Sequence, residues 1–342
     1  MKVVKLNKIR VISKSIILRS KLLKKGGRVV SQKLDVFAHI LPPDFYQRML
    51  ALEPTLPKKY PFIQIPTLVD VTARKKHFLS DEQQVISVAN INPEDYVNPQ
   101  LAQELVWAAN QELAEIVATN KQYFYAGIGM VAMNNLTGAL EIMEKQIAPN
   151  PNLLGIQVFT RALGKSIADA TYRKLFAKAE ELGLLILLHP VFDERKADNN
   201  LIFSWEYELS QAMLALVKGG IFQAYPNLKI VVHHAGAMVP FFSERINHIL
   251  SATEAADFKK FYVDTALLGN TKALELAATY FGVDHLLYGT DAPFGKMPAG
   301  ASSEIRKAIE EMELDESAKQ AIFRDNLLTL VKRGESDGSA TI

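Results

Sequence analysis

The sequence predicts a (β/α)8 barrel, in which a closed ring of parallel strands is surrounded by helices. Short runs rich in Val, Ile and Leu recur along the chain, as is typical of strands buried on both faces of a parallel sheet. Segments with apolar residues at three- and four-residue spacing, which indicate helices, lie between most of these runs. Eight such alternations favour a closed barrel over an open doubly wound sheet.

The expected strands and helices follow one another in order along the chain. The strands are expected at residues 34–40, 85–90, 123–131, 153–159, 184–189, 228–234, 261–266 and 286–290. The clearest helix covers residues 99–119, with Pro99 in its first turn and Asn98 as its N-cap. Further helices are expected at residues 136–147, 168–182, 205–220, 239–250, 271–280, 302–312 and 315–332.

Two long connections are expected to cover the barrel mouth. Residues 41–84 follow the first strand and contain six prolines, so we expect a lid insertion there rather than a simple crossover helix. Residues 190–204, after the fifth strand, form the second long connection. These two segments should shape the pocket above the strand ends.

Composition favours one large domain with a basic extension at its start. The chain has 342 residues, 49% of them hydrophobic, and we assign residues 31–334 to a single barrel domain. Residues 1–30 carry ten Lys or Arg and no acid, and we expect them to be disordered or helical. They are either a basic amphipathic helix for an anionic surface or an extension without a role. Residues 335–342 are expected to be a disordered tail.

The absence of cysteine limits the chemistry. The chain contains no Cys, which excludes disulfides and a thiol nucleophile, so any metal ligands must be nitrogen or oxygen. No apolar run reaches the roughly eighteen residues of a membrane-spanning helix. The net charge of +2 by itself argues for neither a nucleic-acid nor a membrane partner, and we expect neither. We also expect a cytoplasmic location.

Four polar residues end strongly apolar runs and are the candidate site. His39, His189, His234 and Asp291 end the runs LDVFAHI, LLILLHP, LKIVVHH and HLLYGTD. The carboxyl ends of barrel strands are where active sites of this fold lie. His39, His189 and Asp291 match the three protein ligands of a catalytic divalent metal, zinc or manganese, with His234 beside it as a general base. A lone histidine at a strand end is more commonly structural, but four strand ends together favour a site.

Several segments resemble the amidohydrolase-2 family, which includes the aminocarboxymuconate semialdehyde decarboxylases and the resorcylate-type aromatic acid decarboxylases. The resemblance covers residues 34–330 and is most specific in PNLKIVVHHAGAMVPFFSERI and HLLYGTDAPFG, with support from LDVFAHILPP and GLLILLHP. It implies that His39, His189 and Asp291 bind metal and that His234 activates water or substrate. It also implies that Arg245 holds a substrate carboxylate in the site of a neighbouring subunit, and therefore a homodimer.

The chain departs from the family pattern at Phe37. The first strand of the family usually ends His-X-His, and residues at that spacing point to the same side of a strand. Phe37 takes the place of the first of these and cannot bind a metal. Two outcomes stay open: three ligands retain the metal together with water, or the site has lost it.

Three other residues carry weaker signals. His233 should point away from His234, between the strands and the helices, and is interpreted as structural. Asp264 either orients a metal ligand or anchors a loop. Trp205 either stacks on an aromatic substrate or packs within the lid.

The function predicted from these residues is that of a metal-dependent carboxy-lyase acting on a small aromatic or unsaturated carboxylic acid. Protonation of the carbon that bears the carboxylate, by Asp291 or His234, would release carbon dioxide. The same ligands also suit hydrolysis. A third possibility is an impaired barrel that binds a small acid, because Phe37 replaces a ligand.

Overall fold

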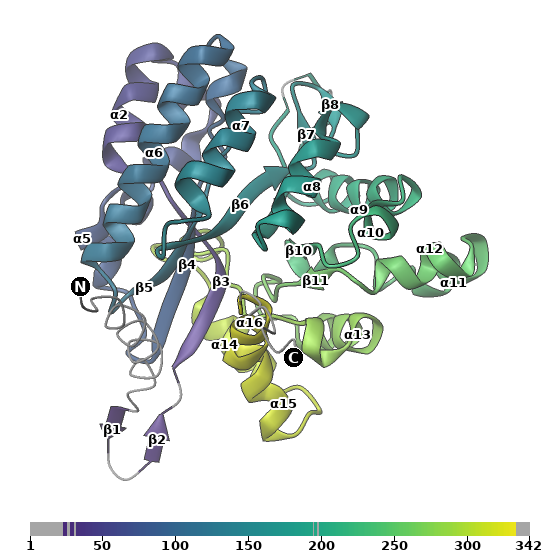
Figure 1. The fold of residues 1–342 in the computed structure, drawn as a ribbon. Helices are drawn as coiled ribbons and strands as arrows, with labels where there is room; N and C mark the ends of the chain where they lie inside the picture. The colour runs from purple at the N-terminus through teal and green to yellow at the C-terminus, as the bar shows by residue number, and fades with distance from the viewer. Residues whose placement is uncertain (1–22, 26–27, 31, 194, 197, 333–342) are drawn as a thin grey trace, which may run out of the picture.

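A curled sheet of seven parallel strands forms the centre of the molecule (Figure 1). The computed structural model describes residues 23–25, 28–30, 32–193, 195, 196 and 198–332. The spatial order of the sheet is β11-β10-β9-β6-β5-β4-β3. Its strands are β3 (Lys33–Ile40), β4 (Glu82–Val88), β5 (Phe124–Gly129), β6 (Leu153–Phe159), β9 (Leu185–His189), β10 (Lys229–Val232) and β11 (Tyr262–Val263).

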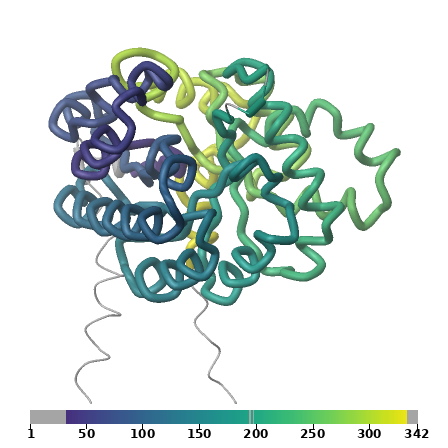
Figure 2. The backbone as a smooth tube through the Cα atoms, turned by 90° about the horizontal axis from the view of Figure 1, so that it is seen from above, coloured from purple at the N-terminus to yellow at the C-terminus, as the bar shows by residue number. Residues whose placement is uncertain are grey.

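Residues 286–292 close the ring between the two edge strands. Leu286 forms a parallel bridge with Val263 of β11, and Ala292 forms one with Ala38 of β3. The backbone amide of His39 also donates to the carbonyl of Ala292 over 2.7 Å. The eighth expected strand is therefore present as an irregular segment, and the predicted barrel fold is confirmed. Figure 2 shows purple and yellow-green segments, from early and late in the described chain, side by side.

Helices surround the strands, close to where their periodicity predicted them. Asn98 caps the longest helix by accepting from the amides of Gln100 and Leu101, and Pro99 opens it, as expected. The larger helices are α2 (Pro43–Leu52), α6 (Pro99–Thr119), α7 (Leu136–Ile142), α8 (Arg173–Glu181), α9 (Ser204–Lys218), α11 (Ser243–Ile249), α12 (Ala252–Phe258), α13 (Thr271–Phe281) and α14 (Ser302–Glu310). Shorter helices are α10 (Ile221–Ala224), α15 (Glu316–Gln320) and α16 (Asn326–Leu330).

The strands separate two hydrophobic cores. Leu185 and Leu187 of β9 belong to the core inside the ring, whereas Ile186 and Leu188 belong to the core under the helices. Side chains therefore alternate between two apolar environments along each strand. This alternation decides which residues at the strand ends face the centre of the barrel.

The insertion after β3 folds into short helices that are anchored to the barrel. It contains α2, α3 (Leu56–Lys59), α4 (Pro66–Val69) and α5 (Val71–Lys75). Buried Arg74 of α5 donates to the carbonyl of His39 and, over 3.2 Å, to that of Ala292. Its guanidinium thus holds β3 beside the closing segment. A lid role for this insertion stays a prediction.

The start of the described chain differs from expectation. Residues 23–30 were expected to be disordered or helical, but β1 (Leu23–Lys25) and β2 (Arg28–Val30) pair as an antiparallel hairpin. Residues 1–22 and the expected tail at 335–342 lie outside the described residues. Within the described chain, every helix is too short or too polar to span a bilayer.

Candidate metal centre

Four side chains converge at the mouth of the barrel. One ligand atom each from His39, His189, His233 and Asp291 lies within 4.8 Å of every other. The Nε2 atoms of His39 and His233 are 3.2 and 3.4 Å from Oδ1 of Asp291. Donors placed tetrahedrally about a zinc ion are about 3.4 Å apart, so the spacing fits one divalent ion.

Strand geometry explains why His39 and His189 face inward. Leu185 and Leu187 point into the ring, so His189, two residues further along β9, points there too. In β3 the register shifts between Asp35 and Ala38, which marks a bulge. The bulge brings both Phe37 and His39 to the inner face at the strand end. The predicted candidates His39, His189 and Asp291 are thus brought together.

The expected orientation of His233 was wrong. It is fully buried with Nε2 beside Asp291, rather than packed between the strands and the helices. Val231 lies in the inner core and Val232 in the outer one, so the alternation along β10 directs residue 233 inward. His234 has a positive φ of 54° and lies beyond the strand, which ends at Val232. It is not among the four clustered groups.

Each histidine of the cluster has its Nδ1 atom engaged with a partner. Nδ1 of His39 lies 3.1 Å from Oγ of Ser87, and Nδ1 of His189 lies 2.5 Å from the carbonyl oxygen of Pro190. Nδ1 of His233 contacts Oδ2 of Asp264. A carbonyl and a carboxylate only accept, so Nδ1 of His189 and Nδ1 of His233 carry a proton, and Nε2 is the atom of each ring that faces a metal. The hydroxyl of Ser87 can donate or accept, so its contact with His39 fits the same arrangement.

The buried Nε2 atoms support a metal as the missing partner. Nε2 of His39 and Nε2 of His233 have no hydrogen-bond partner among the described residues, although both are buried. A buried polar atom left without a partner costs about 1–3 kcal/mol. A divalent ion between these nitrogens and Asp291 would satisfy them, so the residues present fit a metal.

The pKa shifts differ among the four side chains of the cluster. Burial lowers the pKa of His39 and lowers that of His189 further, so both are neutral ligands at pH 7. Burial opposes protonation of His233, but Asp264 and Asp291 outweigh it and raise its pKa to about 10. Burial opposes ionisation of Asp291, but His233 and His39 outweigh it and hold its pKa below the ordinary value. Metal binding would therefore release the proton of His233.

His234 forms a separate pair beside the cluster. Its Nδ1 lies 2.6 Å from Oε1 of Glu206 on α9, and its side chain is 12% exposed. The rings of His233 and His234 are 4.0 Å apart. The sequence predicted Glu206 only as a residue of the first turn of α9. Sequence reasoning did not identify it as the partner of His234, because residues far apart in the chain supply the pair.

Aromatic rings line the mouth around the cluster. Trp205 meets His189 edge-on at 5.8 Å and Phe192 at 4.8 Å. Phe62 of the insertion packs on Phe192, and Phe294 packs on His39 at 5.5 Å. All four of these non-histidine rings are partly exposed, so the predicted residue Trp205 lies in an aromatic wall.

Arg245 lies apart from the cluster. It lines a groove of about 490 Å³ with mainly apolar residues of α9 and α11, including Tyr207, and of the segment before α11, including Met238 and Phe242. Its side chain is exposed and forms no ion pair with a described residue. The structure therefore does not bring Arg245 to the centre of its own barrel.

Asp264 contacts His233 and also anchors a loop. Its Oδ2 contacts Nδ1 of His233, and its Oδ1 accepts from the amides of Ala235 and Ala266 over 3.1 and 3.0 Å. It thus orients the ring of His233 and holds the loop that follows β10.

The chain is similar to several known decarboxylases. The chain is 27% identical over 263 residues to a 2-amino-3-carboxymuconate-6-semialdehyde decarboxylase of Dictyostelium discoideum, covering 72% of this chain and 71% of that protein. It is 28% identical over 202 residues to a 6-methylsalicylic acid decarboxylase of Penicillium expansum, covering 52% and 60%. A 5-carboxyvanillate decarboxylase structure from Novosphingobium aromaticivorans, with bound manganese, shares the fold with a TM-score of 0.78 at 19% identity, covering 91% of this chain and all of that chain.

Family assignment follows from the match to a family model. The model described as Amidohydrolase matches residues 81–330, which is well over half of the chain. This span contains His189, His233 and Asp291, and the resemblance expected from the sequence is confirmed. The chain belongs to the amidohydrolase family.

Proposed function

We propose that the protein is a metal-dependent decarboxylase of a small aromatic carboxylic acid. The observation that carries the proposal is the cluster of His39, His189 and Asp291 at the mouth of the barrel, bordered by partly exposed aromatic rings. The two relatives described above are named as decarboxylases, which supports the same reaction.

His39, His189 and Asp291 would hold the metal, either zinc or manganese. When bound, a divalent ion supplies positive charge that orients a phenolate or carboxylate oxygen of the substrate. The neutral imidazoles and the ionised carboxylate are the forms that ligation requires, and the pKa directions of His39, His189 and Asp291 favour those forms. Manganese bound to a similar fold supports manganese as a candidate.

The aromatic wall would hold the substrate ring. Trp205 lies beside His189, so a planar ring stacked on the indole would place its substituents toward the cluster. Phe192 and Phe294 would exclude water from the space around the carboxylate. Release of carbon dioxide is favoured in such an apolar environment, because the substrate loses its charge there.

His234 would carry the proton. A proton from His234 forms a new C–H bond at the ring carbon that bears the carboxylate. The C–C bond then breaks, its electron pair restores the ring, and carbon dioxide leaves, so no oxidant or reductant is required. Glu206 accepts from Nδ1 of His234, so Nε2 would be the nitrogen that carries the proton to the substrate. Asp291 is held as a carboxylate because its pKa lies below the ordinary value, so it would bind the metal rather than carry the proton.

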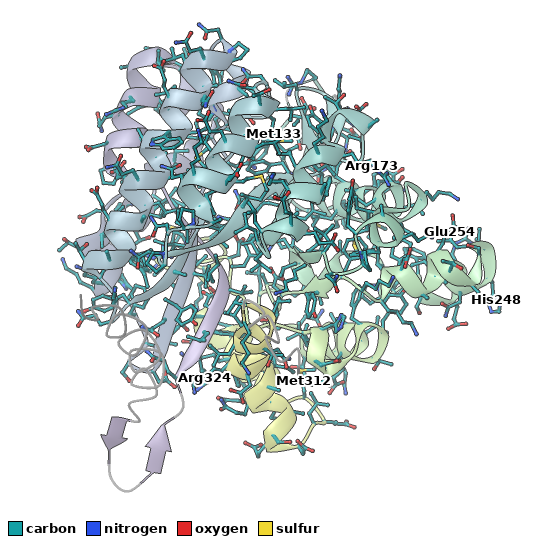
Figure 3. All side chains as sticks on the ribbon, viewed as in Figure 1. Met133, Arg173, His248, Glu254, Met312 and Arg324 are labelled. Carbon is teal, nitrogen blue, oxygen red and sulfur yellow. The ribbon has the colours of Figure 1, made fainter. Side chains whose placement is uncertain are left out.

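Arg245 would act across a homodimer. The groove that it lines is flanked by exposed apolar side chains, including Tyr207 at 52%, Phe242 at 38% and Ile249 at 65% exposure. Figure 3 shows α11 and α12, marked by His248 and Glu254, at the outer edge of the molecule. A second copy packed on this surface would cover it and receive the guanidinium as a partner for the substrate carboxylate.

The direct test is carbon dioxide release from a panel of hydroxybenzoic and unsaturated carboxylic acids, with zinc or manganese added to the purified protein. We expect release from at least one hydroxybenzoic acid, and loss of release after metal removal. Metal-loaded protein that binds such acids without releasing carbon dioxide would support the impaired-barrel alternative instead. A cytoplasmic location stays a prediction that cell fractionation tests.

A further inference from the structure

We infer that His233 is a metal ligand and that it replaces the donor missing at Phe37. This inference rests on the metal site of the proposed function. It changes the expected ligand set from two imidazoles and a carboxylate to three imidazoles and a carboxylate. The sequence pattern had predicted a structural role for His233, not metal binding.

The position of Nε2 is the first observation. This atom of His233 lies 3.4 Å from Oδ1 of Asp291, close to the 3.2 Å between Nε2 of His39 and the same oxygen. It is buried and has no hydrogen-bond partner among the described residues, like Nε2 of His39. A metal ion between the two nitrogens would therefore give each of them the partner that it lacks.

The carboxylate behind His233 is the second observation. Asp264 is fully buried and faces Nδ1 of His233. Two backbone amides, those of Ala235 and Ala266, hold the other oxygen of that carboxylate. A carboxylate that accepts from one ring nitrogen orients the ring and increases the basicity of the other nitrogen, which is the common support of a metal-binding histidine.

Phe37 is the third observation. Its ring lies parallel to that of His233, with centroids 4.0 Å apart and 18° between the planes, and it is fully buried. It occupies the inner face of β3 next to His39, the place from which a second donor of that strand would reach the ion. The phenyl ring therefore fills that space and fixes the plane of His233 instead of binding metal itself.

The neighbouring histidine shows the contrast. His234 pairs with Glu206 on α9 and keeps 12% of its side chain exposed, whereas His233 pairs with Asp264 and is buried. Two adjacent imidazoles thus have different carboxylate partners on different elements. His233 is placed to bind the ion, and His234 is left free of it.

Metal affinity of matched variants tests the inference. The wild type, His233→Asn and His234→Asn would be stripped with chelator, reloaded with zinc or manganese, and titrated against a competing chelator. We expect His233→Asn to bind the metal more than about 100-fold more weakly, because loss of a supporting residue alone costs about 10- to 100-fold. Asp264→Asn should show that smaller loss, and His234→Asn should bind within about threefold of the wild type. Equal affinity of His233→Asn and the wild type would overturn the inference.

X-ray absorption of the zinc-loaded wild type covers the case in which His233→Asn does not fold. Three imidazole ligands support the inference, whereas two contradict it, as does a wild type that takes up no metal. Neither readout depends on activity. Three imidazole ligands without carbon dioxide release would contradict the proposed reaction but support the ligand set. Carbon dioxide release with two imidazole ligands would support the reaction but contradict the ligand set.

Discussion

Phe37 and His233 lie ring to ring at 4.0 Å, in the place where two strand ends meet the candidate metal site. A residue that cannot bind metal is thus packed against one that can. Position 37 carries no metal donor, and His233, directly after β10, would supply the donor that β3 lacks.

Phe37→His should raise the affinity for metal. The side chain at this position points to the inner face beside His39, so an imidazole there would add a donor to the cluster. Competition with a chelator should show tighter binding of zinc than in the wild type, while Phe37→Leu serves as the control without a donor. Unchanged affinity in Phe37→His would contradict the placement of residue 37 at the metal.

Glu206→Gln should lower kcat and leave the metal in place. Glu206 orients His234 through a contact of 2.6 Å, and a positioned acid or base contributes about 10²- to 10⁴-fold to a rate. We expect His234→Asn to lose about that factor and Glu206→Gln to lose less, with KM little changed. Elemental analysis should show wild-type metal content in both. A loss of metal would show that His234 binds the ion.

Arg245→Ala should be rescued by mixing with His234→Asn. Each variant alone lacks one required side chain in every site, so each should have little activity. In a mixed dimer, the site with His234 of one chain receives Arg245 from the other. Activity should therefore appear when the two proteins are unfolded and refolded together. No gain on mixing, or a monomer in sedimentation, would mean that Arg245 does not act across subunits.

Glu94 should make the stability of the protein depend on pH. Its carboxyl is buried with Oε2 lacking a partner in the described chain, and burial raises its pKa from 4.5 to about 8. Between about pH 5 and pH 8 the folded protein then binds one proton more than the unfolded chain. The free energy of unfolding should fall as pH rises through this window, with a slope of up to about 1.4 kcal/mol per pH unit from this group.

Glu94→Gln provides the comparison, because its amide keeps the shape and cannot ionise. Urea unfolding of the metal-free proteins at several pH values should show a flatter curve for Glu94→Gln than for the wild type. Parallel curves would mean that Glu94 is ionised in the folded state.

The fold was predictable because it depends on pattern over many residues. Each buried strand needs an apolar run, and helix α6 begins and ends at the residues that its proline, its cap and its periodicity indicate. The last strand was predicted as regular, but residues 286–292 form isolated bridges with β11 and β3 instead of a continuous ladder. Such local irregularity depends on both neighbours and leaves no periodic signal.

The candidate site was predictable in part. His39, His189 and Asp291 end apolar runs, and the carboxyl ends of parallel strands meet at one edge, so sequence alone determined that these residues lie together. Which of His233 and His234 lies in the cluster was decided only by the tertiary structure. Val231 and Val232 are equally apolar, one inside the ring and one under the helices. When both faces of a strand are buried, hydrophobicity cannot distinguish them, and only the closed barrel determines which side is the centre.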